Sequence, residues 1–125
     1  MQYWGKHLLI DAFAGNLSKI SSEENIRNFV NDLVVKIDMV KYGDLWINNF
    51  ATHDPAKAGY SFVQMIETSN ITGHFVDADG NFYIDVFSCK DYDEQVVLEL
   101  VDLYFSPEST DWLIVDRDAS AFINE

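Results

Sequence analysis

The chain has 125 residues, enough for one domain with a hydrophobic core and too few for two, and 48% of them are hydrophobic. The formal net charge of −13, from 21 acidic and 8 basic side chains, excludes a nucleic-acid-binding protein and favours cationic small-molecule ligands. A single cysteine, Cys89, excludes an internal disulfide and a cysteine-based zinc cluster. No membrane-spanning stretch or secretory signal is evident, so we expect a cytoplasmic protein.

The first half of the chain is predicted to contain a strand, a helix and a short extended piece. An apolar run bounded by glycines predicts a strand over about residues 6–13. Ser21 and Glu24 have the spacing of a capping box, and the apolar residues of an amphipathic helix follow them at Ile26, Phe29, Val30, Leu33, Val34 and Ile37. Residues 41–50 then predict an extended piece, which leads into an irregular loop that starts at Phe50.

The segment from Ser61 to Cys89 is predicted to form a hairpin around a turn at residues 77–81. If residues 61–69 form one extended strand, Ser61, Glu67 and Ser69 lie on one face of it. The returning strand alternates in the same way, so one of its faces carries Tyr83, Asp85, Phe87 and Cys89. We expect this hairpin to bring Cys89 beside Ser69.

The last third of the chain predicts a second helix and a final strand. Apolar residues at helical spacing over 91–105 predict the helix, which ends before Pro107, and residues 111–116 predict the strand. The resulting order, β-α-β-β-α-β, predicts an α+β two-layer sandwich over residues 1–125, with an antiparallel sheet and both helices on one face. The other face is then left for a partner or a site.

Four reactive side chains stand at spacings that together indicate one chemistry. Ser61 precedes Ser69 by eight residues, while His74 and Cys89 follow it by five and by twenty. In these offsets the chain resembles the prokaryotic S-adenosylmethionine decarboxylase proenzymes, which have a helper serine, a self-cleaving serine, a processing histidine and a catalytic cysteine. DVFSC at 85–89 resembles the family's DVFTC, and GKH at 5–7 with Asp11 resembles its opening strand. The resemblance extends over nearly the whole chain, to about residue 117.

The resemblance implies the decarboxylase fold and a pyruvoyl cofactor that the chain makes from its own Ser69. Ser69 would attack the carbonyl of Thr68, Ser61 would stabilise the oxyanion, and His74 would remove the serine α-proton, which leaves the pieces 1–68 and 69–125. The pyruvoyl carbonyl would then accept the electrons left when carbon dioxide departs from the substrate. Cys89 would return a proton to the substrate carbon, and no metal is expected.

The implied substrate is S-adenosylmethionine, decarboxylated for polyamine synthesis, and the implied assembly is a homodimer with its sites near the interface. We expect Glu67, Asp77 and Phe50 to contact the substrate. Two features depart from the family pattern: Thr68 separates Glu67 from Ser69, and the family's ribose-holding glutamate is absent, with Asp77 or Asp79 as substitutes. Two alternatives therefore stay open. One is a pyruvoyl-dependent decarboxylase of ornithine or arginine, and the other is an unprocessed S-adenosylmethionine-binding protein or lyase on the same fold.

Overall fold

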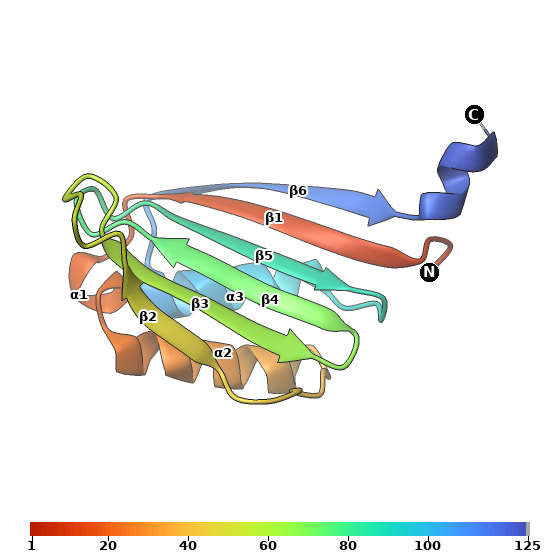
Figure 1. Cartoon of the computed structure of the whole chain (residues 1–125), viewed down its shortest axis with the longest axis horizontal. Coiled ribbons are helices and arrows are strands. Elements are labelled where there is room, and N and C mark those ends of the chain that lie inside the picture. Colours follow the sequence, from red (N-terminus) through yellow and green to blue (C-terminus); the bar gives the residue numbers. More distant parts are fainter. Residues whose placement is uncertain (125) are drawn as a thin grey trace.

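Six antiparallel strands form one sheet in the computed structural model, which describes residues 1–124 (Figure 1). The strands run in the order β2-β3-β4-β5-β1-β6 across the sheet. Their bounds are β1 Gly5–Phe13, β2 Trp46–Phe50, β3 Gly59–Ile66, β4 Ser69–Phe75, β5 Phe82–Ser88 and β6 Ser109–Arg117. Each neighbouring pair is antiparallel, and β6 is followed by a 3-10 helix, η1, at Ala119–Asn124.

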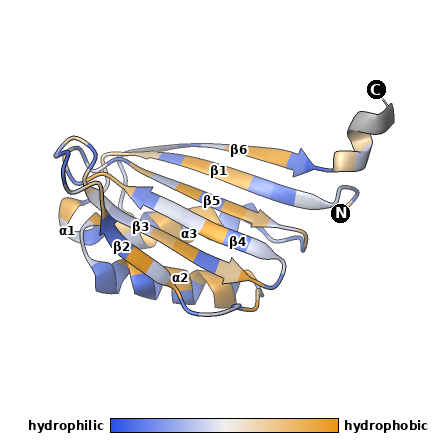
Figure 2. Ribbon diagram, viewed as in Figure 1, coloured by the Kyte–Doolittle hydropathy of each residue, from blue (hydrophilic) through white to orange (hydrophobic). Residues whose placement is uncertain are grey.

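Two main helices, α2 (Glu23–Lys36) and α3 (Glu94–Phe105), cover one face of this sheet (Figure 1). Hydrophobic and polar residues are interspersed along the strands (Figure 2), and the fully buried hydrophobic residues lie on the face that the helices cover. The core includes Leu8, Ile10, Phe29, Leu33, Phe62, Ile71, Phe82, Ile84, Val86, Val101 and Phe105, all at most 1% exposed. The other face of the sheet has no helix over it, and we call it the open face. This arrangement confirms the predicted α+β two-layer architecture.

The predicted capping box of α2 is wrong by one residue. Ser22 is the N-cap, and its hydroxyl accepts a hydrogen bond of 3.1 Å from the backbone N–H of Asn25. Ser21 instead ends a short preceding helix, α1 (Leu17–Ile20), where its hydroxyl donates to the carbonyl of Leu17. Because this earlier turn already uses the Ser21 hydroxyl, the next serine caps the longer helix.

The prediction of one strand over residues 61–69 is also wrong. Strand β3 ends at Ile66, Glu67 and Thr68 form a turn, and Ser69 begins β4. This split adds one strand to the four predicted, and the extended piece that became β2 adds another, so the sheet has six. The split puts Ile66 and Ile71 on the helix-covered face, where both are buried. In one continuous strand, Ile66 and Ile71 would lie on opposite faces, because they are an odd number of residues apart.

None of the helices within residues 1–124 is long and apolar enough to cross a lipid bilayer.

Candidate active site

Ser69 and Cys89 meet at one end of the sheet, as the hairpin prediction expected. Ser69 pairs with Ser88 in the β4·β5 ladder, and Cys89 follows Ser88 directly. The backbone N–H of Cys89 donates a hydrogen bond of 2.9 Å to the carbonyl oxygen of Thr68. The carbonyl that Ser69 would attack is thus already held by a backbone donor. We call this region, residues 67–69 with 88–89, the cleavage end.

The backbone of Ser69 is strained. Its φ angle is +151°, in a region that side-chain-bearing residues rarely adopt and that costs about 1–3 kcal/mol. Ser69 is also the residue whose amide nitrogen would be separated from the Thr68 carbonyl in the expected self-cleavage. The thiol group of Cys89 belongs to a partly buried residue and is not in a disulfide, so it is available for proton transfer.

Ser61 and His74 form a second cluster, far from the cleavage end of the same chain. They face each other across β3 and β4, with 2.9 Å between Ser61 Oγ and His74 Nδ1. Ser61 is 8% exposed, whereas His74 is exposed on the open face. His74 is five residue steps along β4 from Ser69, which corresponds to about 17 Å at ~3.4 Å per step. One chain alone therefore does not unite the four predicted residues, and its own Ser61 does not reach the Thr68 carbonyl.

Two of the three predicted substrate contacts lie near this second cluster. Phe50 is the last residue of β2, and its side chain is 59% exposed. It is near Ser61 because Asn48, two residues before it in β2, pairs with Ser61. Asp77 follows β4, and its backbone N–H donates to the carbonyl of Ala58, the residue just before β3. We call Phe50, Ser61, His74 and Asp77 the histidine end. Glu67, the third predicted contact, lies instead at the cleavage end and is exposed.

The carboxyl group of Asp77 is unusual because one of its oxygens is buried and accepts no hydrogen bond from the described residues. Asp77 Oδ1 is shielded from solvent and has no hydrogen-bond partner among residues 1–124. This burial raises the pKa of the Asp77 carboxyl. A carboxylate with an unused acceptor fits a ligand that brings hydroxyl donors, as a ribose does.

Replacing Asp77 with Asn is expected to stabilise the protein at neutral pH. Because the pKa of Asp77 is higher in the folded state, folding is favoured while the group is protonated, and this contribution is lost as the pH rises through the raised pKa. Asparagine stays neutral, so thermal melts at pH 7 should show a midpoint about 2 °C above wild type, and the gap should narrow towards pH 4. Asp79→Asn, an equal charge change at an exposed position in the same turn, is the control. A lower midpoint for Asp77→Asn at pH 7 would contradict the assignment of an uncompensated carboxylate.

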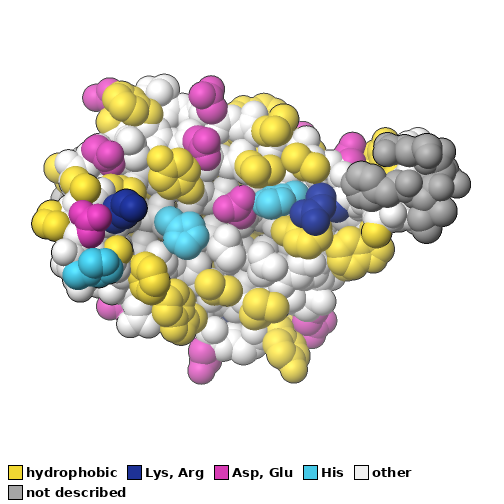
Figure 3. Space-filling view, turned by 45° about the horizontal axis from the view of Figure 1, so that its top comes forward, with side chains coloured by type: hydrophobic (Ala, Val, Ile, Leu, Met, Phe, Trp, Pro, Cys, Tyr) yellow, Lys and Arg dark blue, Asp and Glu magenta, His cyan; other side chains and the backbone are white. Residues whose placement is uncertain are grey.

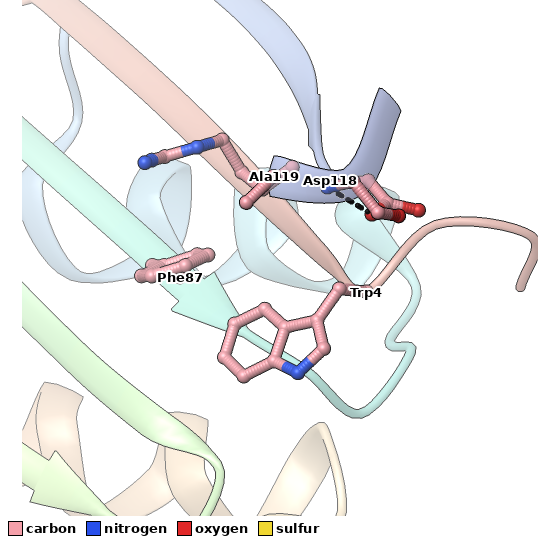
Figure 4. Close-up of a pocket in the computed structure, with 6 residues that line it drawn as sticks. Trp4, Phe87, Asp118 and Ala119 are labelled. Carbon is pink, nitrogen blue, oxygen red and sulfur yellow. Dashed lines mark hydrogen bonds between the residues drawn. The ribbon is translucent and has the colours of Figure 1, made fainter. Parts of the chain in front are cut away.

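A pocket of about 530 Å³ opens beside the cleavage end. Figure 4 shows Trp4, from the segment before β1, and Phe87, from β5, on one side of it, with Asp118 and Ala119 opposite. The ring centroids of Trp4 and Phe87 are 5.8 Å apart, and the guanidinium of Arg117 lies 4.9 Å from the centre of the Phe87 ring. Phe87 pairs with Asn70 in the β4·β5 ladder, directly next to the Ser69 pair. The aromatic wall of the pocket can therefore contact a flat ring one strand away from Ser69.

Sequence reasoning did not identify the two aromatic residues of this pocket as functional. Phe87 could have been found, because strand alternation places it on the same face as Cys89, two residues away. Trp4 carried no local signal. It reaches Phe87 only because β1 and β5 are neighbours, with Lys6 opposite Ser88.

Histidine and acidic side chains continue along the open face towards the pocket. His7 Nε2 is 2.9 Å from Asp85 Oδ1, and the His7 ring lies 5.7 Å from that of Phe87. Figure 3 shows histidines on this side of the molecule among hydrophobic side chains. The exposed hydrophobic residues of the open face are Phe13, Trp46, Phe50, Met65, Tyr83, Leu113 and Val115. Such a set of exposed hydrophobic side chains is typical of a surface that contacts another molecule.

Lys6 fixes the segment that follows Cys89. Its ammonium group lies 2.9 Å from Asp91 Oδ1 and 3.1 Å from Glu94 Oε2, and it also donates to the carbonyl of Tyr92. The hydrogen bond from Lys6 holds the pKa of the Asp91 carboxyl below its ordinary value. Strand β1 and the chain after Cys89 are thereby tied together next to the cleavage end.

Comparison with known proteins gives consistent matches over most of the chain. The family model for S-adenosylmethionine decarboxylase matches residues 6–118. The chain is similar to the S-adenosylmethionine decarboxylase proenzyme of Archaeoglobus fulgidus, at 25% identity over 90% of this chain and 96% of that one. A proenzyme of the same description from Clostridium botulinum is 31% identical over 72% of each chain. The crystal structure of the adenosylmethionine decarboxylase from Aquifex aeolicus has the same fold, with a TM-score of 0.79, 21% identity and coverage of 94% of this chain and 93% of that one.

These matches confirm the resemblance drawn from the four spaced residues and the DVFSC segment. They also confirm the predicted enzyme class, a carboxy-lyase made as a proenzyme, in a family that depends on a pyruvoyl group. The similarity of fold to the Aquifex structure agrees with the six-stranded sheet and its two main helices. The chain belongs to the S-adenosylmethionine decarboxylase family.

Proposed function

We propose that this chain cuts itself between Thr68 and Ser69 and then decarboxylates S-adenosylmethionine through a pyruvoyl group formed from Ser69. The observation that carries the proposal is the geometry of the cleavage end. There the strained Ser69 follows a carbonyl that accepts a hydrogen bond from the Cys89 backbone. The residues present fit a self-derived pyruvoyl group, because serine is its precursor and a free thiol lies at the same end of the sheet.

The cleavage begins with an attack of Ser69 Oγ on the Thr68 carbonyl carbon. A carbon–oxygen bond forms, the amide carbon–nitrogen bond breaks, and the hydroxyl proton ends on the nitrogen, which gives an ester and a free amine. The Cys89 N–H stabilises the negative charge that develops on the carbonyl oxygen during this step. A base then removes the Ser69 α-proton, and the Thr68 carboxylate leaves. Water releases the nitrogen as ammonia, and the second piece begins with a pyruvoyl group.

In the decarboxylation, the pyruvoyl carbonyl supplies an electron sink for the electrons left by carbon dioxide. Cys89 donates the proton that replaces the carboxyl group. The pocket beside Trp4 and Phe87 takes the flat adenine ring by stacking, one strand away from Ser69. The product then serves polyamine synthesis. We place the enzyme in the cytoplasm, where thiols such as that of Cys89 stay reduced.

The base for the α-proton comes from a second copy of the chain. His74 is about 17 Å from Ser69 along its own strand, which is too far for proton transfer. A second protomer, packed with its open face against the first, can present its own Ser61 and His74 to the cleavage end. The exposed hydrophobic side chains of the open face supply the buried area that such a homodimer needs.

The symmetry of the dimer follows from where the two ends lie. A twofold axis between the two sheets and across their strands places the cleavage end of one protomer over the histidine end of the other. Both sites of the dimer are then formed in the same way. Phe50 and Asp77 arrive with His74, which lets Asp77 accept from the ribose hydroxyls and leaves the exposed phenyl ring of Phe50 free to contact the substrate. Glu67 belongs to the cleavage end itself, where its exposed carboxylate attracts the cationic part of the substrate.

Release of carbon dioxide from carboxyl-labelled substrates tests the function. We expect turnover of S-adenosylmethionine with no measurable turnover of ornithine or arginine, because neither amino acid fills the aromatic pocket. Trp4→Ala should raise KM for S-adenosylmethionine by about tenfold through the loss of stacking. Turnover of ornithine or arginine in preference to S-adenosylmethionine would identify the smaller-substrate decarboxylase. A protein that binds S-adenosylmethionine without releasing carbon dioxide would contradict the proposed function.

A further inference from the structure

We infer that Ser88 is a positioning residue for the self-cleavage and that it acts through the hydroxyl group of Thr68. The inference rests on the proposed cleavage between Thr68 and Ser69. It assigns a use to the threonine that separates Glu67 from Ser69. Its basis is a group of hydrogen bonds on the helix-covered side of the cleavage end.

The two hydroxyl groups contact each other directly. Ser88 Oγ donates a hydrogen bond of 2.8 Å to Thr68 Oγ1, and the backbone N–H of Lys90 donates to Ser88 Oγ at 2.9 Å. The Thr68 hydroxyl in turn donates to the sulfur of Met39 at 3.4 Å. Ser88 has no solvent exposure and Met39 is 8% exposed, so these two partners shield the hydroxyl of the half-buried Thr68 from much of the solvent.

These contacts fix the residue before the cleavage point at two places. The carbonyl of Thr68 is held by the Cys89 N–H, and its side chain is held by Ser88. With both held, the plane of the Thr68–Ser69 amide is fixed relative to the strained Ser69 backbone. A hydroxyl attack needs the carbonyl carbon at a defined angle and distance, so restriction of this amide favours the reactive arrangement. The turn also contacts the chain after α2, where the Glu67 N–H donates to the carbonyl of Val40.

If the Thr68 and Ser88 hydroxyls only position the amide, their loss affects cleavage alone. If they stabilise the fold, their loss also affects turnover by the cleaved enzyme. Once cleavage is complete, Thr68 is the end of the first piece and is no longer joined to the reacting residue. The hydroxyl pair then has nothing left to position. Loss of either hydroxyl should therefore slow cleavage and leave the turnover per pyruvoyl group unchanged.

The test measures cleavage rates of full-length variants by intact mass, beginning with freshly made proenzyme. Thr68→Val, which keeps the shape of the side chain, and Ser88→Ala should each slow cleavage about tenfold, the effect of one lost hydrogen bond. Thr68→Ser and Ser88→Thr keep the hydroxyls and should cleave within about twofold of wild type. The double variant, Thr68→Val with Ser88→Ala, should be no slower than the slower single variant, because the two hydroxyls act through one bond. Met39→Leu removes the sulfur that accepts weakly from the Thr68 and Ser88 hydroxyls but keeps the hydrogen bond between them, so it serves as the matched core control and should cleave at close to the wild-type rate.

Two results would overturn the role assigned to Ser88. Cleavage of Thr68→Val at the wild-type rate would overturn it, and so would effects that multiply in the double variant. A slow Ser88→Ala chain whose turnover per pyruvoyl group is also reduced would indicate a general structural role instead. If wild type cleaves but the variants are unaffected, only the role of Ser88 fails. If wild type never cleaves, the proposed function fails as well.

Discussion

Two inactive variants, Ser69→Ala and His74→Ala, are expected to restore one working site when they share a dimer. The Ser69→Ala chain has no nucleophile but brings an intact His74, while the His74→Ala chain brings an intact Ser69. In the mixed dimer, the His74→Ala chain should be cut and the Ser69→Ala chain should stay whole. The reason is the distance of about 17 Å between the two residues along β4, which leaves the histidine of the partner to serve each serine.

The experiment uses co-expressed chains with different tags, so that mixed dimers are isolated by two affinity steps and weighed under denaturing conditions. Each mixed dimer should reach about half of the wild-type activity, since one of its two symmetric sites is complete. The homodimers of each variant, purified in parallel, are the controls and should remain uncut and inactive. An uncut His74→Ala chain in verified mixed dimers would show that the site is completed within one chain.

Replacement of Cys89 by Ala is expected to separate the two reactions of the site. The alanine variant keeps the backbone N–H that donates to the Thr68 carbonyl, so its chain should still be cut. It lacks the thiol that returns a proton to the substrate carbon, so kcat for carbon dioxide release should fall by about 10²–10⁴-fold. Cleavage is followed by intact mass and turnover by labelled carbon dioxide, both on the same preparation.

Ser69→Ala is the matched comparison for this variant, because it should lose both cleavage and turnover. Cys89→Ser retains a hydrogen-bonding group of similar size, and it should resemble Cys89→Ala in turnover because a hydroxyl releases its proton far less readily than a thiol. If Cys89→Ala kept most of its turnover, the proton donor would have to be another group. If it failed to cleave, the thiol would also take part in the first reaction.

The sequence was sufficient to predict the layers of the fold and the meeting of Ser69 with Cys89. Both follow from local patterns. Apolar residues at helical spacing predicted the two main helices, and alternation on each side of the turn at 77–81 predicted a hairpin whose far ends meet. The same alternation indicated the face of β5 that carries Asp85 and Phe87.

The division of residues 61–75 into two strands was not predictable from local signals. The turn that separates β3 from β4 consists of Glu67 and Thr68, and neither residue is typical of a tight turn. Its position follows from the need to bury both Ile66 and Ile71 on the helix-covered face. This dependence on tertiary packing also explains why spacing alone did not reveal that Ser61 and His74 lie far from Ser69 in one chain.

The aromatic pocket and the hydroxyl pair were missed for a related reason. Trp4, Phe87 and Arg117 are distant in sequence and come together only through the strand order β5-β1-β6. Thr68 and Ser88 likewise meet across two ends of a hairpin, and each is an ordinary residue for its position. Such contacts depend on register, which sequence patterns leave undetermined to within a residue or two.

The intact mass of freshly purified wild-type protein, measured under denaturing conditions, tests the central claim most directly. We predict two fragments, one ending at Thr68 and one starting at position 69 with the mass of a pyruvoyl terminus, and complete conversion of the full-length chain on incubation. A single full-length mass that persists, with Ser69 intact, would contradict self-cleavage and would favour an unprocessed S-adenosylmethionine-binding protein or lyase on this fold.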